Sequence, residues 1–279
     1  MTTATETLIS PELMMRYGKL IYDVTGIRIS PQKQALLANR VRRRLKATNI
    51  ADFEGYLRHL QKLKPANAEW DLFLQEITTH ETYLFRDESH WTWFQDQYLA
   101  AISQEAIAGK RPRSLRIWSA ACSTGDEAYS AAVCVAACVK QMSPWTIKII
   151  GTDIGIGAVE QARQATFSQR AMKLVPPSLR TRYFTAAEEP EFSKAKPELS
   201  ALVQFRQHNL LDPLREQPFD LIFLKNVLIY FDEASKQRVV ANVLKLLAPG
   251  GYLVAGAAEG ISDHLKNLKR IHAWLYRNE

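Results

Sequence analysis

The sequence predicts an α/β fold, with a mostly parallel β-sheet covered by helices and an all-α segment in front of it. Up to about residue 77, apolar residues recur at helical spacing. From about residue 114, short apolar runs alternate with helical patterns, which is typical of parallel strands joined by crossover helices. Between residues 167 and 206 this alternation is replaced by a polar, proline-containing stretch. That stretch indicates an insertion or a small β-subdomain.

The N-terminal segment, residues 1–77, is predicted to be a helical domain. Ser10 and Pro11 mark the start of its first helix, because serine is a favoured N-cap and proline suits the first turn. Three further helices are expected within residues 31–50, 51–63 and 68–78.

The helix expected within residues 31–50 carries a basic ridge beside its apolar stripe. The ridge consists of Arg40, Arg42, Arg43, Arg44 and Lys46. Such a cluster is usually a solvated helix face, but it can also dock an acidic partner. The sequence alone leaves both interpretations open.

The remaining residues, 78–279, are predicted to form the α/β domain. Its strong strands are expected within residues 114–121, 146–154, 219–231 and 251–260, and a last edge strand within 268–278. The connecting helices are expected within residues 125–142, 157–166 and 233–251. The β-subdomain insertion is placed at about residues 168–206, with short strands at 182–186 and 201–207.

Composition limits the partners and the compartment. The formal net charge of +7 favours an acidic partner, which could be a nucleic acid, a protein surface or an anionic membrane. No apolar run is long enough to span a bilayer, and the first residues lack the pattern of a secretion signal. We therefore expect a cytoplasmic protein without direct membrane insertion. Its three clustered cysteines fit a reducing compartment, and the absence of zinc spacing predicts no metal site.

Candidate site residues follow the ends of the predicted strands, where open α/β sheets bind ligands. Glu127 follows the first strand and the loop that ends at Gly125. Asp153 ends the second strand, Lys225, Asn226 and Tyr230 follow the third, and Glu259 follows the fourth.

Asp153 is the most informative of these residues. A carboxylate at the second strand end can accept hydrogen bonds from the vicinal hydroxyl groups of a ribose. The alternative is a loop aspartate that caps the next helix, since aspartate is a favoured N-cap. We favour the ribose contact.

The first strand runs into the loop ACSTG, residues 121–125, which contains a single glycine. A dinucleotide fingerprint has three glycines because the pyrophosphate must approach the backbone closely. A cofactor with an adenosine but no phosphates needs only one permissive turn, here Gly125. This favours S-adenosylmethionine over NAD, FAD or ATP, and no P-loop motif occurs in the chain.

Several segments together resemble the bacterial chemotaxis receptor methyltransferases, the CheR family. They include NRVRRRL and DFEGYL in the helical part, the linker TTHETYLFR, the loop WSAACSTGDEAYS, the strand end GTDI and the segment KNVLIYF. The resemblance extends over nearly the whole chain. It implies a helical N-terminal domain followed by a Rossmann-like S-adenosylmethionine-dependent methyltransferase domain with a small β-subdomain.

The resemblance also implies roles for individual residues. The cofactor contacts would be His80, Thr82, Arg86, Glu127, Asp153, Asn209, Leu210, Lys225 and Asn226. Arg86 and Tyr230 would act in catalysis, with Tyr230 near the transferred methyl group and the substrate. Histidine at position 80 and lysine at position 225 differ from the asparagine and arginine common in the family, but both keep a hydrogen-bond donor.

The implied activity is transfer of a methyl group to glutamate side chains on the cytoplasmic helical region of chemoreceptors, for sensory adaptation. The products are glutamyl methyl esters and S-adenosylhomocysteine. Arg40, Arg43 and Arg44 would then dock the acidic receptor surface. We expect a cytoplasmic monomer that is recruited to membrane receptor arrays and binds no nucleic acid.

Two other functions compete with this one. Methylation of a nucleic acid would use the positive charge equally well. However, base-amine methylation typically uses a D/N-P-P-Y/F strand end, and here the strand ends in Asn226-Val227-Leu228-Ile229-Tyr230 without prolines. A cofactor-sensing scaffold without activity is disfavoured by the intact set of polar strand-end residues.

Overall fold

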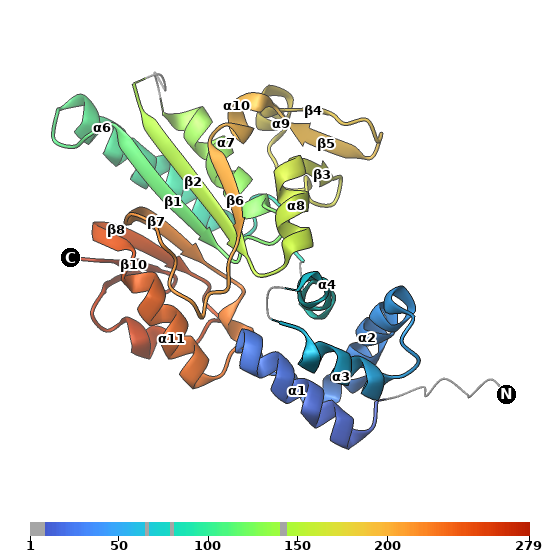
Figure 1. Ribbon diagram of the computed structural model, residues 1–279. Helices are drawn as coiled ribbons and strands as arrows, with labels where there is room; N and C mark the ends of the chain where they lie inside the picture. Colours follow the sequence, from blue (N-terminus) through green and yellow to red (C-terminus); the bar gives the residue numbers. More distant parts are fainter. Residues whose placement is uncertain (1–8, 65–66, 79–80, 140–143) are drawn as a thin grey trace.

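The computed structural model describes residues 9–64, 67–78, 81–139 and 144–279. His80, which the sequence places among the cofactor contacts, lies outside these residues. Figure 1 shows the N-terminal helices packed below the α/β domain, on the side where strands β1 (Ser114–Ala120) and β2 (Thr146–Asp153) end. Within the described residues, no helix has the length and apolar character that a bilayer crossing requires.

The helical domain contains the four predicted helices, α1 (Pro11–Thr25), α2 (Gln34–Thr48), α3 (Phe53–Lys62) and α4 (Ala68–Ile77), with a 3₁₀ turn, η1 (Pro31–Lys33), before α2. The predicted start of α1 is confirmed, because Ser10 Oγ accepts a hydrogen bond from Leu13 N and Pro11 begins the helix. The apolar faces of the helices meet in a core around Tyr17, Leu37 and Phe73. The bundle therefore buries its own core.

The main sheet has seven strands in the order β6-β2-β1-β7-β8-β10-β9. The strands that follow β2 are β6 (Val203–Gln207), β7 (Phe219–Leu224), β8 (Leu247–Ala255), β9 (Lys269–His272) and β10 (Leu275–Arg277). Strands β6, β2, β1, β7 and β8 are mutually parallel, whereas β10 is antiparallel to both of its neighbours. Because β1 lies between β2 and β7, the order of the strands reverses there, which creates a crevice at the carboxyl ends of the strands.

Several details differ from the sequence-based expectation. The helix expected within residues 233–251 ends at Leu244, and residues 247–251 belong to β8 instead. The strand expected at residues 201–207 in the insertion is β6, which pairs with β2 in the main sheet. It fits there because Phe205 packs over Gly151, where an added Cβ would lie only 2.6 Å from the Phe205 ring. The single edge strand expected at 268–278 is a hairpin of β9 and β10, since the chain reverses between them at residues 273–274.

Helices cover both faces of the sheet, as its apolar strands require. One face packs against α7 (Asp126–Cys138) and a helical segment absent from the sequence-based prediction, α5 (Glu88–Trp93), the π-helical turn η2 (Phe94–Leu99) and α6 (Ala100–Ile107). The other face packs against α11 (Glu233–Leu244). Successive residues of β7 alternate between the two cores, with Phe223 in the first and Ile222 and Leu224 in the second.

The insertion forms a separate antiparallel sheet of β3 (Thr166–Ser168), β5 (Phe192–Ala195) and β4 (Phe184–Ala186). It follows α8 (Ile156–Gln164) and includes the short helices α9 (Pro177–Tyr183) and α10 (Pro197–Ser200). Figure 1 shows this small sheet beside α8, away from the C-terminal strands.

Candidate active site

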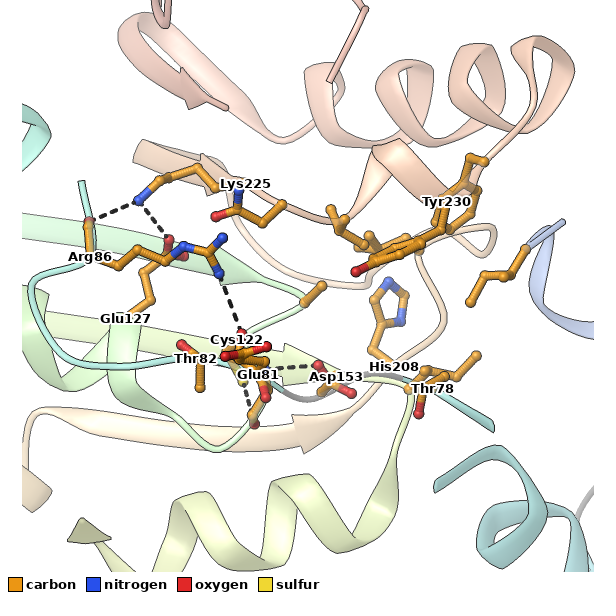
Figure 2. A pocket seen from close by; sticks show the side chains of 18 of the residues that line it. Thr78, Glu81, Thr82, Arg86, Cys122, Glu127, Asp153, His208, Lys225 and Tyr230 are labelled. Atoms are coloured by element: carbon orange, nitrogen blue, oxygen red, sulfur yellow. Dashed lines mark hydrogen bonds and ion pairs between the residues drawn. The ribbon is translucent and has the colours of Figure 1, made fainter. Parts of the chain in front are cut away.

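A deep cavity lies where β1, β2 and β7 end, and the helical domain closes one side of it. Thr25, Ile27 and Thr78 of the helical domain contribute to its wall. The described residues predicted to contact a cofactor or to act in catalysis all line this cavity: Thr82, Arg86, Glu127, Asp153, Asn209, Leu210, Lys225, Asn226 and Tyr230. Figure 2 shows Arg86 and Glu127 toward one end and Tyr230, His208 and Thr78 toward the other.

The loop after β1 reaches this cavity through a strained backbone. Ala121 and Ser123 have φ angles of 60° and 51°, in the left-handed region that non-glycine residues rarely adopt. Gly125 follows with φ 89°, and a Cβ there would lie 2.9 Å from Ala162 Cβ and 3.0 Å from the Phe205 ring. The single glycine thus stands where a side chain has no room, while alanine and serine make the other turns of the loop.

We expect Gly125→Ala to lower the free energy of unfolding by about 2–3 kcal/mol, because it adds both left-handed strain and a steric clash. Gly109→Ala is a matched control, since Gly109 also has a positive φ, 70°, but no atom lies within 4 Å of an added Cβ. Gly109→Ala should lower the free energy of unfolding by only about 1 kcal/mol. Urea denaturation of the two variants measures the difference, and equal losses would contradict the role of the clash.

Asp153 is held in one orientation by backbone donors. Its side chain is buried, Oδ2 accepts a hydrogen bond from Ser123 N at 2.8 Å, and Oδ1 accepts one from Gly155 N at 2.9 Å. The first of these bonds joins the end of β2 to the loop after β1. The carboxylate therefore faces the cavity in a fixed plane and also stabilises the left-handed Ser123.

Lys225, Glu127 and Asp87 form a charge cluster, the Lys225 cluster, in which Lys225 and Glu127 are largely buried and Asp87 is 40% exposed. Lys225 Nζ lies 3.0 Å from Asp87 Oδ2 and 3.5 Å from Glu127 Oε2, and its side chain is 2% exposed. Glu127 Oε1 also accepts a hydrogen bond from Ser119 Oγ at 2.8 Å. Figure 2 shows Lys225 reaching both Glu127 and the backbone of Arg86, whose carbonyl oxygen accepts a bond from Nζ at 3.4 Å.

The cluster shifts the pKa values of its two carboxyl groups in opposite directions. Burial raises the pKa of Glu127 above its usual value, and the Lys225 ammonium and the Ser119 hydroxyl limit the rise. Partial burial acts in the same sense on Asp87, but there the charge and hydrogen bond of Lys225, together with the charges of His90 and Arg86, outweigh it and the pKa is lowered. Lys225 therefore favours the ionised form of Glu127 in the cavity.

Arg86 lies at the same end of the cavity. Its Nη1 donates a hydrogen bond to Glu81 O at 3.3 Å, and its guanidinium carbon lies 5.7 Å from the centre of the Tyr83 ring. Thr82, which lies between Glu81 and Tyr83 in the sequence, also lines the cavity wall. The linker motif thus contributes a planar cation to the site, as its sequence indicated.

Tyr230 stands on a loop that is fixed from two sides. Buried Glu259 accepts backbone hydrogen bonds from Asn226 N and from Leu228 N, the second at 2.6 Å, and Asn226 has a positive φ of 57°. On the other side, Arg28 N donates to Tyr230 O at 3.0 Å. Glu259, a strand-end residue in the sequence, therefore supports the Tyr230 loop and does not line the cavity.

Asn209 and Leu210 differ in what they present to the cavity. The Asn209 amide donates from Nδ2 to Val24 O at 2.8 Å and accepts from Leu211 N at 3.1 Å, so its side chain ties the end of α1 to the end of β6. Leu210 is buried and adds an apolar surface to the wall. The side chain of Asn209 thus has an interdomain structural role in addition to lining the cavity.

His208 is a cavity residue that sequence reasoning missed. Its Nε2 is buried and, within the described residues, has no hydrogen-bond partner, while burial lowers the pKa of the ring. A neutral imidazole with an unsatisfied nitrogen at a ligand cavity favours a polar ligand atom there. Its position directly before Asn209 was the only signal that the sequence offered.

The basic ridge of α2 is less uniform than its sequence indicated. Arg44 pairs with Glu69 through two hydrogen bonds of 2.7 and 3.0 Å, the two side chains are 13% and 12% exposed, and Tyr56 also donates to Glu69. Arg43 pairs with Glu76 at 2.6 Å but stays 61% exposed. Arg44 therefore joins α2 to α4, and Arg43 faces solvent.

We expect Arg44→Ala to lower the free energy of unfolding by about 2–3 kcal/mol, because Glu69 would lose its cation in a mostly buried position. Arg43→Ala, which removes an exposed ion pair, should change it by no more than about 0.5 kcal/mol. Thermal and urea denaturation compare the two variants. Similar losses would contradict the structural role of Arg44.

The chemistry of the cavity fits an adenosyl cofactor without phosphates. The Asp153 carboxylate suits a pair of ribose hydroxyls, and Glu127 and Arg86 suit the ammonium and carboxylate of an amino acid. Leu210, Ile154 and the unsatisfied His208 nitrogen suit a flat, partly polar ring. Among the described residues, no three His, Cys, Asp or Glu side chains are grouped so as to hold a metal ion.

Fold and site together define an S-adenosylmethionine-binding methyltransferase of the Rossmann-like class, preceded by an all-α domain. A family model described as "CheR methyltransferase, SAM binding domain" matches residues 80–275, and one described as "CheR methyltransferase, all-alpha domain" matches residues 15–78. The chain belongs to the CheR methyltransferase family.

Characterised relatives are similar over most of the chain. "Chemotaxis protein methyltransferase 2" of Pseudomonas aeruginosa is 35% identical over 88% of this chain and 86% of its own length. "Chemotaxis protein methyltransferase" of Salmonella typhimurium is 33% identical over 89% and 83%, and that of Borreliella burgdorferi is 30% identical over 96% and 95%. The similarity thus includes both domains.

Proposed function

We propose that this methyltransferase transfers the methyl group of S-adenosylmethionine to glutamate carboxylates on the cytoplasmic helical region of chemoreceptors. The main support is the convergence of Asp153, Glu127 and Arg86 in one cavity whose wall includes residues of the basic helical domain. The names of the relatives support the link to chemotaxis. The proposed enzyme is a cytoplasmic monomer that joins membrane receptor arrays through its substrate.

Different cavity residues bind different parts of the cofactor. Asp153 accepts hydrogen bonds from the ribose hydroxyls, and Glu127 accepts one from the ammonium of the methionine part. Arg86 orients a carboxylate by its planar guanidinium. Lys225 favours the ionised form of Glu127, because its charge lowers the Glu127 pKa against the larger, opposite effect of burial.

The chemical step needs little from the protein beyond alignment and exclusion of water. The bound cofactor would supply a sulfonium methyl group, whose carbon the carboxylate oxygen attacks in line, so that a C–O bond forms as the C–S bond breaks and S-adenosylhomocysteine leaves as a neutral thioether. A glutamate is already ionised at neutral pH, so no strong base is required. Tyr230 forms the wall beside the incoming carboxylate, and Glu259 holds its loop through two backbone bonds. The helical domain shields this wall through the contact of Arg28 with Tyr230.

A radiolabelled methyl-transfer assay on receptor-containing membranes tests this proposal. We expect label that base treatment releases as methanol, because a glutamyl methyl ester is base-labile. Label in RNA, or base-stable label in protein, would overturn the glutamate assignment. No transfer to either, with cofactor binding intact in calorimetry, would favour a cofactor-sensing scaffold.

The docking role of the basic ridge rests on its exposed members. Arg43→Glu should raise the KM for the receptor about tenfold and leave the cofactor Kd unchanged, because it reverses a charge that faces the acidic substrate. Arg58→Glu, on the exposed side of α3, carries the same charge change outside the ridge and should leave KM near the wild-type value. Equal effects of the two variants on KM would contradict the docking role and would indicate that the ridge is only a solvated helix face. Arg40 donates a hydrogen bond to Ile77 O, and Arg44 pairs with Glu69. Substitution of either residue would therefore change the stability of the helical domain as well as its charge.

A further inference from the structure

A second cavity adjoins the active site on the side of the helical domain. This cavity, the α2 groove, lies between α1, the segment after it, α2 and the Tyr230 loop. Ile27, Thr78 and Tyr230 line both cavities, so the groove continues from the end of the active site that Figure 2 shows at Tyr230 and Thr78. The two cavities therefore share a wall where the substrate carboxylate is expected.

The groove has an apolar floor and an apolar residue open to solvent. Ile21, Leu37 and Ile77 are buried beneath it, whereas Leu36 on its wall is 44% exposed. A leucine of this exposure beside an apolar floor offers surface that a partner's side chain can bury. The floor belongs to the core of the helical domain.

Three basic residues, Arg28, Lys33 and Arg40, also line the groove. Lys33 lies over the Tyr230 ring, with Nζ 5.5 Å from the ring centre. The side chain of Arg28 is 73% exposed although it pairs with Asp232 at 3.5 Å. An apolar floor with a cationic rim is complementary to an amphipathic acidic helix, whose apolar face enters while its carboxylates meet the rim.

We propose that the α2 groove is a specificity subsite, which receives an apolar side chain about one helical turn from the target glutamate on the same face of the substrate helix. Residues one turn apart on a helix share a face and lie about 5–6 Å apart, which suits two cavities that share Tyr230. Leu36 is the residue of this chain that selects for the apolar neighbour. This inference rests on the proposed function.

The test uses the full chain and a helical cytoplasmic fragment of a chemoreceptor with one methylatable glutamate. Leu36→Asp should raise the KM for this fragment about tenfold, since it places a charge against an apolar side chain and repels acidic neighbours. The kcat and the cofactor Kd should keep their wild-type values. Leu72→Asp is the matched control, because Leu72 on α4 is 43% exposed and does not line the groove.

A reciprocal change in the substrate gives a second measurement. A fragment with aspartate in place of the apolar neighbour should be a poor substrate for the wild type and a better one for Leu36→Lys. Equal KM changes in Leu36→Asp and Leu72→Asp, or indifference to the neighbouring residue, would overturn the subsite alone. If the wild type transfers no base-labile methyl group to the unmodified fragment, both the proposed function and the subsite are wrong.

Discussion

Asp153→Ala is expected to weaken S-adenosylmethionine binding by about 100-fold or more. In the proposed complex the lost interactions would be two charge-assisted hydrogen bonds to the ribose, each worth roughly 1.5–3 kcal/mol. Ser123 N and Gly155 N already orient the carboxylate, so in the wild type the Asp153 side chain loses little conformational entropy when the cofactor binds. Isothermal titration calorimetry measures the change.

Two controls separate binding from folding in this experiment. Asp153→Asn keeps one acceptor oxygen and should lie between alanine and wild type in affinity. Asp212→Asn makes the same chemical change at an exposed aspartate and should bind the cofactor normally. Wild-type affinity in Asp153→Ala would refute the ribose contact, and a melting curve without cofactor shows how far the loss of the backbone bonds destabilises the loop.

Lys225→Met is expected to lower the free energy of unfolding by about 2–4 kcal/mol near neutral pH, because it leaves the mostly buried Glu127 carboxylate without its cation. Asp87 adds less to this loss, since its side chain is 40% exposed and water screens its charge. Lys225 is 2% exposed and lies between Asp87 and Glu127, so no other group of the cluster takes its place. Lys225→Arg keeps the charge and should retain most of the stability. Urea denaturation of the three proteins measures both differences, and a loss shared equally by the arginine variant would point to shape and not to charge.

The loss of stability in Lys225→Met should depend on pH. Burial raises the Glu127 pKa, and without Lys225 it should rise further, so stability falls as pH increases from the usual glutamate pKa of about 4.3 to the higher folded value. The lowered pKa of Asp87 contributes stability above its unfolded pKa, and this contribution also needs Lys225. Both effects make the difference between wild type and variant larger near pH 7.5 than near pH 4.5. A difference that does not vary with pH would contradict the electrostatic account.

Most helices and most strands could be predicted from the sequence because their signals are local, but the helical segment from α5 to α6 was not. The stripe of Leu37, Val41 and Leu45 and the cap at Ser10 need only neighbouring residues. The location of the candidate site could also be predicted from the sequence, because the carboxyl ends of parallel strands lie at one edge of the sheet. Asp153 and Lys225 thus line one cavity although they are far apart in the sequence.

Pairing between distant segments could not be predicted in the same way. Strand β6 was expected in the insertion, yet it completes the main sheet because Gly151 leaves room for Phe205. The C-terminal segment was expected as one strand, and it folds into two because its residues find partners on β8 and on each other. Neither outcome is encoded in local periodicity.

The sequence by itself determined the family, most of the elements and most of the polar residues that line the cavity, although not His208. Only the tertiary structure decided which charges pair: Lys225 with Asp87 and Glu127, and Arg44 with Glu69. It also showed that Asn209 holds α1 and that the Tyr230 wall is shared with the α2 groove. The reason is that charge pairing and cavity shape depend on distances of a few ångströms between elements, whereas motifs record only positions along the chain.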